Sequence, residues 1–167
     1  SWDSWCMNGQ GGADRFRFDL ATAELAVALA FTLDWLGDEI PGETREKLLS
    51  MINERIFDTF VETAAPGGDK RPAWWYNGVT NWNSVCCGGA ACLAYYLAAD
   101  ISGKASGKKT RTAGLAHKVI ELAEKSLDAY IGHMHSDGSN EEGVSYWMYG
   151  MMFLLYAFIA YEKYTGR

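Results

Sequence analysis

Nearly uncharged helical segments alternate along this chain with segments that carry charge on one side only. Three segments, over about 19–36, 80–100 and 144–164, hold apolar side chains on almost every side, which is typical of buried helices. The two segments between them, about 43–63 and 110–132, have the spacing of amphipathic helices. The buried segments recur at intervals of 61 to 63 residues. This pattern predicts helical hairpins that stack side by side, with one helix of each pair inside and the other outside.

The predicted fold is therefore all-α, a single helical domain over 1–167 with about five main helices. We expect the hairpins to form part of an (α/α) toroid, roughly half a ring, with a plain four- or five-helix bundle as the alternative. The small run 88–91 (GGAA) indicates that another helix approaches the second buried segment closely. No amphipathic segment follows the third buried segment. A second copy of the chain or a further C-terminal region is expected to cover it.

Composition argues against several classes of function. Seven Trp, nine Tyr and seven Phe among 167 residues exclude a disordered chain, and a net charge of -6 argues against nucleic acid as a partner. The four cysteines lack the spacing of a zinc site, so no metal or cofactor is predicted, and adjacent Cys86 and Cys87 are expected to be buried thiols. The longest apolar run, 146–161, is interrupted by Gly150 and is shorter than a membrane span, so no membrane partner is expected. The first residues lack the pattern of a signal peptide.

The expected topology brings three polar and aromatic stretches together. Inner helices of successive hairpins run parallel, so residues 1–18, 74–83 and 136–149 meet at one rim. Parallel helix N-termini present free N–H groups and positive dipole ends, which favour an anionic ligand. Tryptophan rings offer flat apolar faces to sugar rings. The sequence thus predicts a rim suited to an anionic ligand, with tryptophans that either stack on sugar rings or pack within their loop.

Two of these stretches carry the candidate chemistry. They are 74–83 (WWYNGVTNWN) and 137–150 (DGSNEEGVSYWMYG). Together with 19–24 (DLATAE) and 34–36 (DWL), they resemble the toroid domain of the heparinase II/III-like polysaccharide lyases. In that family an Asn-Trp-Asn type stretch opens one inner helix, and an Asp-Gly-Ser…Glu-Gly…Tyr-Trp-x-Tyr-Gly stretch opens the next. The resemblance covers nearly the whole chain.

The resemblance implies β-elimination at a uronate residue of an acidic polysaccharide, in a periplasmic or secreted protein. This reaction needs a group that neutralises the sugar carboxylate, a base and an acid. An Asn side chain donates two N–H groups without being a base, and the motif match assigns Asn81 or Asn83 to neutralisation. The match assigns proton transfer to Tyr146, with Tyr149 in reserve one helical turn away. A tyrosine needs help to ionise, because its ordinary pKa is near 10.

The residues expected to contact substrate also have structural interpretations. They are Trp74, Trp75, Trp82, Glu142, Arg15 and Arg17. The three tryptophans could equally pack within their loop. Glu142 lies where a carboxylate stabilises a helix N-terminus, and the two asparagines lie where helix capping is common.

The aromatic residues divide into two predicted groups. One follows helical spacing and is assigned to the core: Phe31, Trp35, Phe57, Phe60, Phe153 and Phe158. The other gathers where the buried segments begin and is assigned to the carbohydrate rim: Trp74, Trp75, Tyr76, Trp82, Tyr146 and Tyr149.

Two other functions stay open. A glycoside hydrolase on an α/α scaffold would use Asp137, Glu141 or Glu142 as acid and base, and needs two carboxylates about 5–10 Å apart. A non-catalytic helical module for binding or assembly, or an inactive fragment, is favoured by the third buried segment, which lacks an amphipathic partner.

Overall fold

The computed structural model describes residues 18–104 and 110–166, most of which are helical. In chain order the helices are α1 (Leu20–Leu36), α2 (Gly42–Ile52), α3 (Asp58–Ala64), α4 (Asn81–Lys104), α5 (Arg111–Gly132) and α6 (Val144–Thr165). A π-helical segment, η2 (Asn53–Phe57), joins α2 to α3 without a break, so these elements form one outer helix. The described residues contain no strand. The prediction of an all-α fold with five main helices is confirmed.

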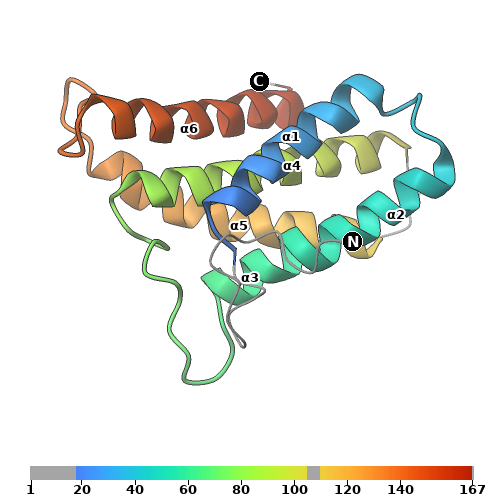
Figure 1. The fold of residues 1–167 in the computed structure, drawn as a ribbon, viewed down its shortest axis with the longest axis horizontal. Helices are drawn as coiled ribbons and strands as arrows, with labels where there is room; N and C mark the ends of the chain where they lie inside the picture. Colours follow the sequence, from blue (N-terminus) through green and yellow to red (C-terminus); the bar gives the residue numbers. More distant parts are fainter. Residues whose placement is uncertain (1–17, 105–109, 167) are drawn as a thin grey trace.

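The three apolar helices α1, α4 and α6 run in the same direction, and α4 and α6 begin at one end of the molecule, whereas α1 begins farther along α4, with Ala23 against Gly89 (Figure 1). Tyr149, early in α6, bonds to Glu24 early in α1, and Lys163 near the end of α6 pairs with Asp34 near the end of α1. This order of contacts requires the two helices to be parallel. The stretches 74–83 and 136–149 of the predicted rim therefore lie together, with the start of α1 beside the first turns of α6, whereas residues 1–17 of that rim lie outside the described residues. That these helices form part of an (α/α) toroid stays a prediction.

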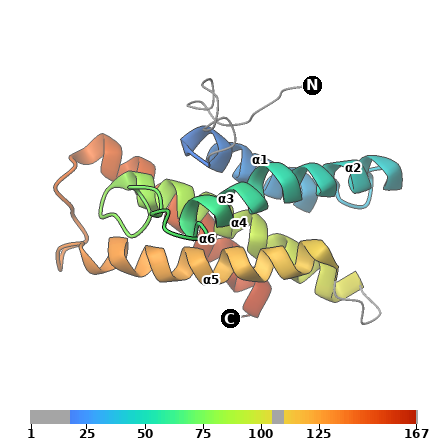
Figure 2. The same ribbon diagram turned by 90° about the horizontal axis from the view of Figure 1, so that it is seen from below.

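The two amphipathic helices return in the opposite direction. In Figure 1 the α2–α3 helix runs back along α1, and in Figure 2 α5 runs back along α4. Side-chain caps begin two helices of these hairpins: Asp19 accepts from the Thr22 amide at the start of α1, and Thr110 accepts from the Ala113 amide at the start of α5. The hairpin pairing expected from the alternation is thereby confirmed.

Helix α4 lies at the centre, packed against α1, α5 and α6. Its glycines allow this packing: a Cβ at Gly88 would lie 2.6 Å from the carbonyl oxygen of Phe153 in α6. A Cβ at Gly89 would lie 2.7 Å from the carbonyl oxygen of Ala23 in α1. The close helix approach predicted from the small run is confirmed. The neighbouring Cys86 and Cys87 are buried, as expected.

Burial divides the aromatic residues that were assigned to the core. Phe57, Phe60 and Phe153 are buried. The assignment was wrong for Trp35, which is 76% exposed at the end of α1, and for Phe158, which is 49% exposed on α6. Both follow helical spacing, but Trp35 lies at the end of its helix and Phe158 borders a hollow between α6 and its neighbours.

Helix α6 has 22 residues and is longer than the apolar run that the sequence suggested. By length and composition it meets the requirement for crossing a membrane, in contrast to the prediction from the interrupted run. Core helices of soluble proteins meet the same requirement. Here one face of α6, with Gly150, Phe153 and Ala157, packs into the fold.

Candidate functional site

The rim formed by the N-terminal ends of α1, α4 and α6 carries most of the residues predicted from the sequence (Figure 1). Its sides are the turn before α4 and the turn before α6. Arg15 and Arg17, which were predicted to contact substrate, lie outside the described residues.

Two tyrosines in the first turns of α6 differ sharply in environment. Tyr146 is 62% exposed. Tyr149 is half-buried against the core, and its hydroxyl donates a 2.5 Å hydrogen bond to Oε1 of Glu24 in α1. Burial, together with the Glu24 carboxylate, raises the pKa of Tyr149 well above its ordinary value. Tyr149 therefore keeps its proton at neutral pH, where its hydroxyl donates to Glu24.

Glu142 links the start of α4 to the loop before α6. Its Oε2 accepts a 2.6 Å hydrogen bond from the backbone amide of Asn81, and its own amide donates to Oδ1 of Asn140. A carboxylate thus binds at the N-terminus of α4, where free N–H groups and the helix dipole favour negative charge. Asn81 itself is buried next to Gly150. The contacts of Glu142 are those of a residue that stabilises a helix N-terminus.

Asn83 lies in the interior, and the structure corrects its assignment to carboxylate neutralisation. Its Nδ2 donates to the carbonyl oxygen of Gly78 at 2.7 Å, and to the carbonyl oxygen and Oγ of Ser126 at 3.0 and 3.1 Å. The residue is fully buried. Its amide therefore ties the loop before α4 to α5 and has no surface for a substrate.

The tryptophans of the rim differ in their exposure to solvent. Trp74 is 66% exposed, and its ring lies 5.0 Å, centre to centre, from that of half-buried Trp82. Trp75 is buried against Phe18 and Phe60, which corrects its assignment to substrate contact. Trp74 and Trp82 remain as an accessible aromatic pair.

Tyr76 was assigned to the same rim, and the structure buries it as well. Its hydroxyl donates to the carbonyl oxygen of Leu122 in α5. Since the ring and the hydroxyl are both engaged, Tyr76 anchors the loop before α4 rather than facing a ligand.

The acidic turn before α6 gives the hydrolase alternative little support. Asp137 accepts hydrogen bonds from the amide and the hydroxyl of Ser139 at 2.9 and 2.7 Å. These bonds lower the pKa of Asp137, so it is a poor general acid. Glu141 is exposed. The contacts of Asp137 and Gly138 are those of a turn.

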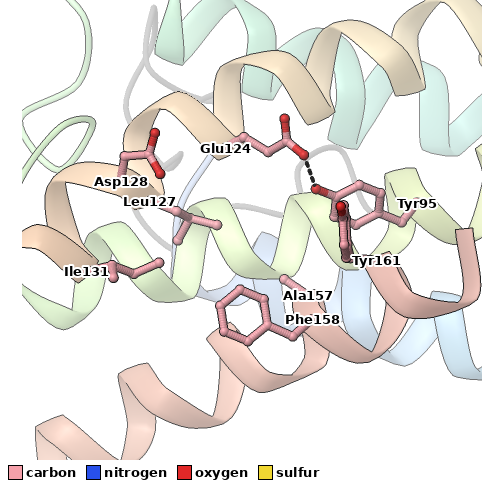
Figure 3. A pocket seen from close by; sticks show the side chains of 8 residues that line it. All are labelled: Tyr95, Glu124, Leu127, Asp128, Ile131, Ala157, Phe158 and Tyr161. Atoms are coloured by element: carbon pink, nitrogen blue, oxygen red, sulfur yellow. Dashed lines mark hydrogen bonds between the residues drawn. The ribbon is translucent and has the colours of Figure 1, made fainter. Parts of the chain in front are cut away.

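A hollow of about 360 Å³ lies between α4, α5 and α6, and sequence reasoning did not find it. Its lining residues are Tyr95, Glu124, Leu127, Asp128, Ile131, Ala157, Phe158 and Tyr161. Figure 3 shows the Tyr95 hydroxyl pointing to Glu124, to which it donates a 2.6 Å hydrogen bond. Burial and this carboxylate raise the pKa of Tyr95. The available signal was the α5 surface, where acidic Glu124 and Asp128 flank apolar Leu127.

Neither the protein-family models nor the curated proteins contain a match to this chain. Within residues 18–104 and 110–166, no group of three or more His, Cys, Asp or Glu side chains is placed to hold a metal ion.

Proposed function

We propose that the chain is a polysaccharide lyase-like module that binds a uronate-containing glycan at the rim and takes part in β-elimination through Tyr146. One observation carries the proposal. The exposed Tyr146 phenol lies one helical turn from the protonated Tyr149–Glu24 pair, near the N-terminal ends of three parallel helices. This combines proton-transfer groups with a surface that favours anions.

Carboxylate binding at the rim is supported by the contact between Glu142 and Asn81. The start of α4 already accepts a carboxylate at 2.6 Å within the chain. A sugar carboxylate has the same chemistry and would be stabilised by the same helix N-terminus. Both asparagines are buried, so neither Asn81 nor Asn83 is proposed as the carboxylate neutraliser, and the proposal assigns this role to the N-terminus of α4.

Sugar binding is supported by the aromatic pair of Trp74 and Trp82. Trp74 presents most of its ring to solvent beside the start of α4. An indole face covers a sugar ring with apolar surface, and its polar edge can stay in water. This pair is the proposed stacking platform.

The proposed chemistry uses the tyrosines in separate roles. A base removes the proton on the carbon next to the sugar carboxylate, and the electron pair left behind forms a carbon–carbon double bond as the glycosidic bond breaks. The leaving oxygen takes a proton from an acid. Tyr149 carries its proton at neutral pH and is proposed as the acid, whereas exposed Tyr146 is accessible to the sugar and is proposed as the base.

The test measures ultraviolet absorbance of unsaturated uronate while the chain is incubated with a panel of uronate polymers. We expect product from at least one polymer, loss of it in Tyr146→Phe, and no change in Tyr161→Phe, an exposed tyrosine away from the rim. Glycan binding is followed by tryptophan fluorescence and should be lost in Trp74→Ala. Binding without product would favour the non-catalytic module, and absence of both would contradict the proposal.

A further inference from the structure

One face of α6 is apolar along most of its length and is not covered by the described part of the chain. Six apolar side chains, each between 40% and 79% exposed, form this face, which we name the α6 outer stripe. They are Val144, Met148, Met152, Leu155, Phe158 and Ile159. Five of them are spaced three or four residues apart, and the sixth, Phe158, lies at the edge of the stripe beside the hollow between α4, α5 and α6. The opposite face of the helix packs on α4, so the stripe points away from the core.

The area of the stripe matches one side of a protein–protein interface. The exposed fractions leave on the order of 700 Å² on these six residues, near the roughly 800 Å² that each partner contributes to an interface of standard size. It also exceeds the largest apolar patch of a typical monomer, which is about 300–600 Å². The size therefore indicates a macromolecular occupant.

The order of residues in the stripe is complementary to itself when reversed. Met148, Met152, Leu155 and Ile159 are spaced by four, three and four residues, the spacing of core positions in a coiled coil. In an antiparallel pair of such helices, Met148 lies opposite Ile159 of the partner subunit, and Met152 lies opposite Leu155 of the partner subunit. Every contact then occurs twice about a two-fold axis, as in most homodimers.

Charge favours the same arrangement. No charged side chain lies on α6 between Val144 and Tyr161, so two stripes meet without buried charge. Glu162 follows on the same side of the helix. The first turn of α6 has no acidic residue, and its N-cap, Gly143, offers no side-chain hydrogen bond. Antiparallel pairing brings the partner subunit's Glu162 to this N-terminus, where a carboxylate is stabilising.

We infer that the chain forms a two-fold homodimer in which α6 of each copy pairs antiparallel with α6 of the other, centred between Met152 and Leu155. The inference is independent of the proposed glycan chemistry. It covers the stripe with a surface of matching size, pattern and charge.

Sedimentation velocity of the chain at micromolar concentration should give twice the monomer mass. Leu155→Glu sets a charge at the centre of each stripe and should shift the protein to monomer. Met148→Glu, at an exposed position, should do the same if Leu155→Glu fails to fold by circular dichroism. The matched control is Val79→Glu, an exposed apolar residue in the loop before α4, which should stay dimeric.

Cross-linking tests the direction of pairing. In a Cys6→Ser background the remaining cysteines are buried. Leu155→Cys, next to the axis, should be joined into a dimer by a short bis-maleimide. Val144→Cys should not, because about 28 Å of helix separates it from its own copy in an antiparallel pair.

Three results would overturn the inference. The first is a wild-type monomer at all concentrations tested. The second is efficient cross-linking of Val144→Cys, which indicates parallel pairing. The third is a monomer that co-sediments with phosphatidylcholine vesicles and loses this in Met148→Glu, which assigns the stripe to a membrane surface.

Discussion

Gly88 in α4 lies against the backbone of Phe153 in α6, so that a methyl group at Gly88 would approach the Phe153 carbonyl oxygen to 2.6 Å. A backbone carbonyl cannot rotate away as a side chain can. The distance between the two helices is therefore set by the absence of a side chain at this position. Gly89 plays the same part toward Ala23 of α1.

Gly88→Ala should destabilise the protein although alanine is the better helix former. Relief of the clash requires movement of a helix. This movement more than offsets the roughly 1 kcal/mol that alanine gains in a helix, so the free energy of unfolding should fall by about 1–3 kcal/mol net. Gly114→Ala in α5 is the matched control: its Cβ would lie in open space, so it should stabilise by about 0.5–1 kcal/mol. Urea unfolding measures both. Equal effects of the two substitutions would contradict the close-contact interpretation.

Asn83→Ala should lower the free energy of unfolding by about 2–4 kcal/mol, because it leaves buried acceptors of Gly78 and Ser126 without a donor. Ser126→Ala removes the hydroxyl that bonds to the Asn77 amide and to Asn83. Since both changes act on one network, the double variant should cost less than the two single costs added. Additive costs would show that the residues act separately. Exposed Ser145→Ala, as control, should change stability by less than about 0.5 kcal/mol.

The helices were predictable because their signal is local. Charge-free and amphipathic segments differ in every turn, and α1, α4 and α6 begin at Leu20, Asn81 and Val144, close to the predicted starts. Which side of a helix is covered depends on segments far away in the sequence. Trp35 has the spacing of a core residue, yet nothing in the described fold packs over most of its ring.

The same limit explains the errors at the rim. Asn81 and Asn83 both follow Thr80 at the start of α4. Only the placement of α5 shows that the side-chain amide of Asn83 donates its hydrogen bonds to Ser126. Adjacent Trp74 and Trp75 are chemically identical, but one faces solvent and the other the core. A motif identifies residue types, whereas accessibility comes from the packing of distant helices.

Glu142→Ala should destabilise the protein by about 1 kcal/mol, because the first amide of α4 loses its charged acceptor. Glu141→Ala, the exposed neighbour, should change stability by less than about 0.5 kcal/mol. Thermal unfolding compares the two. If Glu142 serves only as a helix cap, the fluorescence change on glycan addition persists in Glu142→Ala. Loss of glycan binding with unchanged stability would instead assign Glu142 to substrate contact.

Tyr149 should make the stability of the protein fall with rising pH in the alkaline range. Its pKa in the folded state is raised above the ordinary value of 10.0 by burial and by Glu24. Above pH 10 the unfolded chain therefore releases this proton while the folded chain keeps it, so stability is complete below pH 10 and declines as pH rises toward the folded pKa. Tyr149→Phe should reduce this decline. Tyr161→Phe should leave it unchanged.

Urea unfolding from pH 8 to 11 measures this decline for the three proteins. Tyr95, whose pKa is also raised, contributes a decline of the same sign that remains in Tyr149→Phe. The informative quantity is therefore the difference in slope between wild type and Tyr149→Phe. An identical slope would show that Tyr149 ionises normally in the folded protein, and its proposed role as the protonated donor at the rim would then be lost.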